Sequence, residues 1–252
     1  MVSDVRVTLK TGEALDMVQK SYLVGNFILA GFAGSVRIGF DLLQSLSLML
    51  RPAKEETLSN AWDPSWVART WAPEAKRVFN ASPKLEQQLG ARLLMVGVSP
   101  TQKLGASDFH RVQIVRFASP DFLPGFLNKQ RNICHIGTGS GVTHYTRALK
   151  SALRVESGLF AYESVGFGWW GTKLAHDLSQ VIADHPRKSI SHNLVVHAAR
   201  LGEVVVRTND LAFFSDDGDS PDSIVMPPLA TSYRAFLDEV NGGHHRASCA
   251  TC

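Results

Sequence analysis

The sequence lacks any apolar run close to the roughly 18–20 residues that a membrane-spanning helix requires. It also lacks any run of five or more basic residues: its 26 Lys and Arg residues are scattered, and the formal net charge is only +3. Neither a membrane protein nor a nucleic-acid-binding protein is therefore indicated. No charged and apolar leader begins the sequence, so we expect a cytoplasmic protein.

Cysteine is also scarce. The three cysteines of the chain give no disulfide framework. Two of them, Cys249 and Cys252, lie close to His244 and His245, and a C-x-x-C spacing beside histidines is compatible with zinc binding. No second ligand pair frames this cluster, so we expect residues 241–252 to be a disordered tail.

The chain is long enough, and hydrophobic enough, to form one substantial core. It contains 252 residues (27.6 kDa), of which 44% are hydrophobic and 19% charged, as in ordinary globular proteins. No internal repeat is visible. We therefore expect a single domain over residues 1–240.

The order of the predicted elements separates strands from helices. In the first half, apolar patterns predict strands at residues 1–8, 18–24, 27–30, 91–98 and 110–117, a small-residue turn at 31–35, and helices at 35–50 and 64–79. In the second half they predict a strand from residue 133 into a glycine-rich turn at 137–141, a strand at 203–207, and helices at 142–154, 172–182, 189–201 and 230–240. This order favours an α+β fold, with sheets covered by separate helical layers.

Three short motifs near the N-terminus stand in a distinctive order. The segment SDVRVT at residues 3–8 is followed by Lys20 and then by AGFAGS at residues 30–35. Together they resemble the β subunits of the proteasome and of the related two-component bacterial peptidase, which are N-terminal-nucleophile hydrolases. The resemblance covers residues 1–50 well and 130–210 moderately. It implies a four-layer αββα sandwich.

The resemblance also implies a threonine-type peptidase site. In this family an N-terminal threonine attacks the scissile carbonyl, and its own α-amine accepts the proton. By resemblance, Asp4 orients Lys20, whose charge lowers the pKa of the nucleophile, and Gly34 donates the backbone N–H of an oxyanion hole. Ser140, with Thr138 as the alternative, would hydrogen-bond the amine. Read without the family, Asp4 and Lys20 form only a surface ion pair.

The same resemblance predicts the substrate and the partners. Thr8 and Gly34 would pair with an extended peptide or unfolded protein, and Phe32 would line the pocket for its side chain. Members of this family form homo-oligomeric stacked rings, and an ATPase unfoldase can deliver their substrates. No cofactor is required, but the backbone carbonyls of Gly202, Val205 and Thr208 match a segment that binds a monovalent or divalent cation in bacterial members.

The nucleophile itself is missing from its expected position. In the family a first strand, headed by the threonine, precedes the aspartate, whereas Asp4 is here the fourth residue. We therefore expect the sequence as given to be inactive. Two explanations stay open: a natural start further upstream, or a non-catalytic, ring-forming paralogue.

A different family competes for the glycine-rich turn. The sequence IGTGSG at residues 136–141, with Glu156 downstream, resembles the glycine motif and ribose-binding acid of S-adenosylmethionine-dependent methyltransferases. Residues 134–135, Cys-His, replace the usual acid before the first glycine. The alternating strands of a doubly wound sheet are also not predicted after Glu156.

Overall fold

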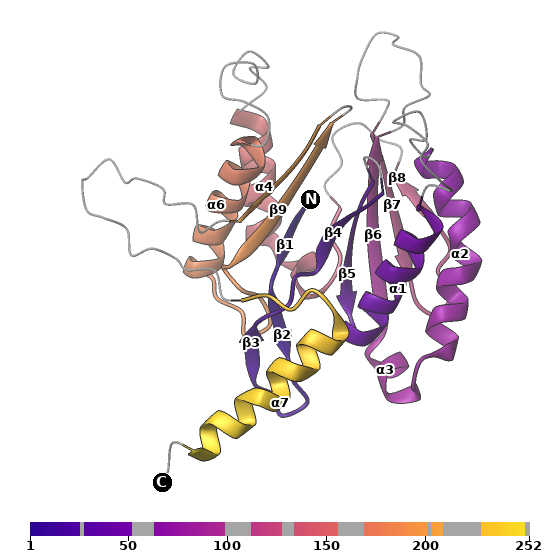
Figure 1. The fold of residues 1–252 in the computed structure, drawn as a ribbon. Helices are drawn as coiled ribbons and strands as arrows, with labels where there is room; N and C mark the ends of the chain where they lie inside the picture. The colour runs from indigo at the N-terminus through magenta and orange to yellow at the C-terminus, as the bar shows by residue number, and fades with distance from the viewer. Residues whose placement is uncertain are drawn as a thin grey trace.

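The computed structural model describes residues 1–25, 28–51, 63–98, 112–127, 134–155, 169–200, 203–208 and 228–249 (Figure 1). Within these residues the fold is mixed α+β, with three antiparallel sheets and six α-helices. The predicted α+β class is therefore confirmed. No helix of the described residues is both long and apolar enough to cross a membrane.

The largest sheet has five strands in sequential order. They are β4 (Ser21–Gly25), β5 (Ile28–Gly34), β6 (Ala91–Val98), β7 (Val112–Ala118) and β8 (Gly125–Leu127). On one face, Phe32, Leu93 and Phe117 are cross-strand neighbours, and all three are buried. This face therefore forms the floor of the main core.

Two long helices cover that face (Figure 1). Helix α1 (Val36–Met49) begins at Ser35, whose hydroxyl accepts a hydrogen bond from the Ile38 N–H. Helix α2 (Pro64–Ala81) begins at Asp63 in the same way, so both predicted helix starts are confirmed. The Phe32 ring lies 5.3 Å from that of Phe40 in α1, and Phe117 lies 5.2 Å from Trp71 in α2. The short helix α3 (Lys84–Leu89) then leads into β6.

A smaller sheet lies beside the first and carries its own helices. Its order is β1 (Val2–Asp4), β9 (Leu194–Arg200) and β10 (Glu203–Thr208). Strand β9 contacts β4, β5 and β6. On the outer side, α6 (Trp169–Asp184) packs on β9, and α4 (Thr143–Val155) packs on α6 (Figure 1). A second cluster of buried residues, which includes Tyr145, Ala175 and Val196, fills this region.

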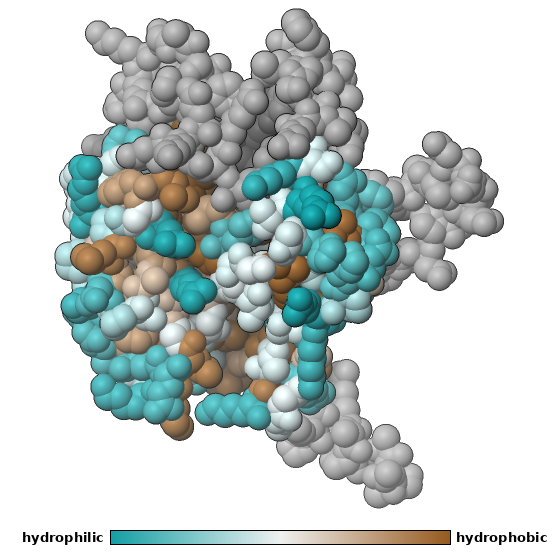
Figure 2. Space-filling model, turned by 180° about the vertical axis from the view of Figure 1, so that it is seen from behind, coloured by the Kyte–Doolittle hydropathy of each residue, from teal (hydrophilic) through white to brown (hydrophobic). Residues whose placement is uncertain are grey.

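The remaining elements are a two-stranded ribbon and a terminal helix. The ribbon pairs β2 (Arg6–Thr8) with β3 (Ala14–Asp16). Helix α7 (Tyr233–Cys249) continues past residue 240, where the sequence predicted a disordered tail to begin. Seen from behind, the hydrophobic residues of the described surface lie in several patches separated by hydrophilic ones (Figure 2).

Two strand predictions at the N-terminus are wrong in detail. The single strand expected at 1–8 is divided at the fully buried Val5, whose carbonyl accepts hydrogen bonds from the N–H groups of Met17 and Val18. The chain thereby leaves one sheet and enters the ribbon. The turn expected at 31–35 is mostly strand, because β5 runs on to Gly34 and pairs with β6 over its whole length.

Two predictions further along the chain are also wrong. The helix expected at 189–201 is the strand β9. Leu194, Val195 and Val196 are all buried, and a strand that is covered on both faces shows no polar alternation to distinguish it from a buried helix. The strand expected from residue 133 is not present at residues 134–136, which are irregular and lead into the 3₁₀ turn Thr138–Gly141.

Candidate functional site

A cavity of about 1110 Å³ is lined by residues of β1, β2, β5 and β6 and by the glycine-rich turn. Four of the predicted catalytic residues line it: Asp4, Lys20, Gly34 and Thr138. They come from four separate stretches of sequence. The fold therefore brings the three N-terminal motifs and the glycine-rich turn to one cavity.

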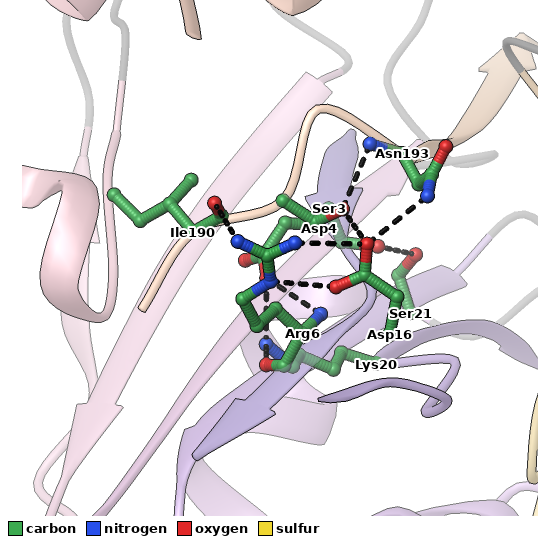
Figure 3. Close-up of polar contacts among 9 residues, drawn as sticks. Ser3, Asp4, Arg6, Asp16, Lys20, Ser21, Ile190 and Asn193 are labelled. Carbon is green, nitrogen blue, oxygen red and sulfur yellow. Dashed lines mark hydrogen bonds and ion pairs between the residues drawn. The ribbon is translucent and has the colours of Figure 1, made fainter. Parts of the chain in front are cut away.

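Asp4 and Lys20 form an ion pair at the wall of this cavity (Figure 3). Lys20 Nζ lies 2.9 Å from Asp4 Oδ1 and 2.5 Å from the carbonyl oxygen of Arg6. The backbone N–H of Arg6 donates to the same Asp4 oxygen, at 2.9 Å. The Lys20 side chain is only 15% exposed and that of Asp4 26%, so the pair is better shielded than a surface ion pair.

Gly34 ends strand β5 in a conformation that suits glycine. Its φ is +99°, and an added Cβ would lie 2.3 Å from the carbonyl oxygen of Gly90. The Phe32 N–H, two residues earlier, donates to the Lys20 carbonyl, at 3.0 Å. The backbone of Lys20 and the glycine strand are thus held together directly.

The glycine-rich turn packs against the same strand. A Cβ at Gly137, whose φ is +85°, would lie 3.1 Å from the Cβ of Ala33. Thr138 follows and lines the cavity, whereas Ser140 does not. The exposed Ser140 hydroxyl donates to the Gly137 carbonyl, at 2.8 Å, and so closes the turn. Of the two alternatives for contact with an amine, Thr138 is therefore the one beside the cavity.

The two predicted substrate-binding residues differ in their surroundings. Thr8 is exposed at the end of β2 and lines the cavity. Phe32 also borders the cavity, but its ring is only 4% exposed and packs against Phe40 and Gly39. On β5 the residues that face away from this core are Gly31 and Ala33, because side chains alternate along a strand.

The predicted cation segment falls on β10. Gly202 lies outside the described residues, and Val205 and Thr208 pair regularly with β9. Carbonyl groups three residues apart on a regular strand point to opposite edges, so those of Val205 and Thr208 do not converge. The described residues contain no group of three or more His, Cys, Asp or Glu side chains that could hold a metal ion.

A buried polar chain, which no sequence motif indicated, lies beside the site. The Ser3 and Ser21 hydroxyls are 2.7 Å apart, and Ser21 Oγ is 3.0 Å from His197 Nδ1. Burial, and then the charge of the N-terminus, lower the pKa of His197 to about 4, so its ring is neutral at pH 7. The Met1 amine donates to the His197 carbonyl, at 2.7 Å, and burial lowers the pKa of this amine to about 6.

A second network fixes Arg6 (Figure 3). Its guanidinium bonds both oxygens of Asp16, at 2.7 and 3.2 Å. Ser191 Oγ and Asn193 Nδ2 donate to Asp16 Oδ2, at 2.5 and 3.0 Å. Burial raises the pKa of Asp16, but the hydrogen bonds and the charge of Arg6 outweigh burial and lower it. These bonds attach the segment before β9 to the β2–β3 ribbon. They also hold Arg6 in place, and its carbonyl accepts the hydrogen bond from Lys20.

One polar group at the cavity has no hydrogen-bond partner among the described residues. His135 lines the cavity, and its buried Nε2 has no hydrogen-bond partner within the described part of the chain. Burial lowers the pKa of His135, so the ring is neutral at pH 7. From the sequence, residues 134–135 were expected to lie in a strand and to depart from the methyltransferase motif, and no motif indicated a buried histidine at the cavity.

The sheets do not favour the methyltransferase alternative. That resemblance needs a doubly wound parallel sheet, with the glycine turn between a central strand and a helix. Among the described residues, all strands of the sheets pair antiparallel. Residues 134–136, which lead into the glycine-rich turn, do not form a strand.

Comparison with models of known protein families finds no match for this chain. Comparison with the sequences of characterised proteins finds none either.

Proposed function

We propose that this chain is a subunit of a proteasome-type peptidase, an N-terminal-nucleophile hydrolase of the threonine type. The observation that carries the proposal is the meeting of the Asp4–Lys20 ion pair and Gly34 at one cavity. The three residues belong to separate short motifs of the sequence. A chance resemblance would give no reason for them to share a cavity.

The layers of the fold support the same proposal. Helices α1 and α2 cover one sheet, α4 and α6 lie on the outer side of the other, and β9 contacts strands of the larger sheet. This order corresponds to the αββα sandwich that we propose for the domain.

In the proposed mechanism the described residues supply charge and orientation. The Lys20 ammonium, held by Asp4 and by the Arg6 carbonyl, lowers the pKa of a threonine hydroxyl placed beside it. The Gly34 N–H stabilises the oxyanion that forms when this hydroxyl attacks a peptide carbonyl. In this proposal Thr138, which lines the cavity, hydrogen-bonds the α-amine that accepts the hydroxyl proton. As the tetrahedral intermediate collapses, the protonated α-amine gives this proton to the nitrogen of the breaking peptide C–N bond, and the free amine product leaves an acyl-enzyme ester behind. The same α-amine, now unprotonated, then deprotonates a water molecule that hydrolyses this ester and releases the threonine hydroxyl.

The threonine belongs, in this proposal, to a strand that precedes Met1. Strand β1 lies at the end of its sheet, with β9 on one side and no partner on the other among the described residues. An open edge of this kind accepts a further strand. Such a strand would pass along the cavity, since Val2, Ser3 and Asp4 all line it.

The test compares two chains in a peptidase assay. One is the 252-residue chain, and the other is extended in frame through its upstream coding sequence. We expect the extended chain to cleave fluorogenic peptides and the shorter chain to be inactive. Lys20→Ala in the extended chain should reduce kcat/KM at least about 100-fold, whereas Lys84→Ala, a charge-matched control at an exposed position that does not line the cavity, should change it less than about twofold.

Two outcomes would contradict the proposal. One is a folded extended chain with no peptidase activity. The other is cleavage by the 252-residue chain that Lys20→Ala leaves unchanged. Light scattering would show separately whether either chain forms the oligomeric ring that the family resemblance implies.

A further inference from the structure

The cavity side of the five-stranded sheet carries two arginines among small residues. Opposite the buried face, the register places Ala33, Arg92 and Ala118 side by side on β5, β6 and β7. The next row on the same face is Gly31, Leu94 and Arg116. Because cross-strand partners share a face, both arginines project on the side opposite the core.

The two arginines are diagonal neighbours. Arg92 pairs with Ala118, and Arg116 lies two residues before Ala118 on the same strand. Diagonal positions of this kind are about 7–8 Å apart in an antiparallel pair, which is within the reach of two long side chains. Both side chains are exposed, so their like charges are close together and open to a ligand.

Neither arginine is neutralised within the described part of the chain. Lys20 pairs with Asp4, and Arg6 with Asp16, but no ion pair involves Arg92 or Arg116. Glu86, the second acidic side chain that lines the cavity, accepts a hydrogen bond from Ser35. Arg92 at the cavity wall and its neighbour Arg116 therefore carry positive charge that no ion pair of the described residues compensates.

The pair also lies beside the proposed reaction centre. Arg92 lines the cavity and follows Ala91, the register partner of Gly34. Arg116 lies close to Cys134: burial raises the pKa of that thiol, and the Arg116 charge opposes the rise. The next residue, His135, lines the same cavity. Arg116 does not itself line the cavity, but it is the diagonal neighbour of Arg92, so a peptide side chain directed at Arg92 from near Gly34 is also within the reach of Arg116.

We propose that Arg92 and Arg116 together bind the carboxylate of a Glu or Asp side chain in a peptide that occupies the cavity. The proposal rests on the proposed peptidase function and names its substrate class as acidic peptides. Guanidinium groups bind carboxylates through paired, charge-assisted hydrogen bonds. Gly31, Ala33 and Ala118 leave space around them, because none of these residues has a side chain larger than a methyl group. A carboxylate between the arginines also removes the repulsion between their charges.

The test is a binding experiment that requires no cleavage. Two fluorescein-labelled peptides of equal length, which differ only in Glu against Gln, are titrated with the 252-residue chain, and fluorescence anisotropy is measured. We expect the Glu peptide to bind at least about tenfold more tightly, and this preference to fall as salt is added. Arg92→Gln and Arg116→Gln should each reduce the preference about threefold or more, and the double variant should abolish it.

Arg77→Gln provides the matched control. Arg77 lies on α2, pairs with Glu74 and does not line the cavity, yet its replacement removes the same unit of charge. It should leave the preference unchanged, and circular dichroism should show that all variants are folded. Equal binding of the two peptides by the folded chain, or an equal loss in Arg77→Gln, would overturn the proposal.

The outcome is separable from that of the peptidase assay. If the extended chain cleaves peptides but shows no preference for the Glu peptide, the proposed acidic specificity is wrong and the proposed peptidase function stands. If the preference for the Glu peptide depends on both arginines but the extended chain cleaves nothing, the proposed carboxylate site stands and the proposed peptidase function is wrong.

Discussion

Met1 and His197 are joined by a reciprocal pair of backbone hydrogen bonds. The Met1 amine donates to the His197 carbonyl, at 2.7 Å, and the His197 N–H donates to the Met1 carbonyl, at 2.9 Å. Met1, which directly precedes β1, is thereby fixed beside the buried imidazole of His197. Two groups that normally carry charge near neutral pH are thus both buried in one place.

This burial predicts that the protein loses stability as the pH falls. Both groups have a lowered pKa in the folded state, from 8.0 to about 6 for the amine and from 6.5 to about 4 for His197. The unfolded chain therefore binds more protons between pH 8 and 4, and the free energy of unfolding decreases towards acid. For His197 the decrease is on the order of 3 kcal/mol between pH 6.5 and 4.

Urea unfolding at several pH values would measure this effect. His197→Asn should flatten the curve between pH 6.5 and 4, while the slope between pH 8 and 6, which belongs to the amine, should persist. His192→Asn replaces an exposed histidine and should leave both slopes intact. An unfolding free energy of the 252-residue chain that stays constant from pH 8 to 6 would show that the Met1 amine of this chain is not buried in solution.

Gly34→Ala should destabilise the protein severely. The positive φ of +99° is unfavourable for alanine, and the new Cβ would lie 2.3 Å from the Gly90 carbonyl oxygen. We expect a loss of at least about 3 kcal/mol in the free energy of unfolding. Gly141→Ala is the control, because a Cβ there meets nothing within 4 Å. If the two variants unfold at the same urea concentration, β5 does not end as described.

The local part of this site could be predicted from the sequence because short motifs carry it. The aspartate, the lysine and the glycine strand lie within 34 residues of the N-terminus and are separated by recognisable turns. Helix starts at Ser35 and Asp63 were predictable for a similar reason, since a capping side chain acts on N–H groups only three residues away.

The long-range part could not be predicted. Asp16 bonds Ser191 and Asn193, and Ser21 bonds His197, across separations of 175 to 177 residues. No local pattern encodes such pairs. The prediction of a helix at 189–201 also hid them, because it did not place these residues next to β1. Because β9 is buried on both faces, its sequence does not alternate between polar and apolar residues. This lack of alternation led to the prediction of a helix and so concealed the hydrogen bonds to β1 and its neighbours.

Loss of the Asp4–Lys20 pair should cost more than loss of a surface pair. Asp4→Asn keeps an acceptor for the Arg6 N–H but leaves the Lys20 ammonium shielded without its counter-charge. We expect a decrease of about 1–2 kcal/mol in the free energy of unfolding. Asp121→Asn breaks the Lys76–Asp121 pair, also 2.9 Å long but about half exposed on both sides, and should cost less than about 0.5 kcal/mol. Equal costs from urea unfolding would show that Asp4 and Lys20 behave as surface charges.

Ser21→Ala tests whether the buried hydroxyl chain beside the cavity contributes to the fold. The fully buried Ser21 bonds both Ser3 Oγ and His197 Nδ1, and its removal leaves the imidazole nitrogen without this partner in the core. We expect a loss of about 1–3 kcal/mol in the free energy of unfolding. Ser140→Ala removes a hydroxyl that bonds only its own exposed turn, and it should cost less than about 1 kcal/mol. The NMR signals of the His197 ring should shift in Ser21→Ala and stay in place in Ser140→Ala. If Ser21→Ala is as stable as the unmodified protein and the ring signals do not move, the Ser3–Ser21–His197 chain does not exist in solution.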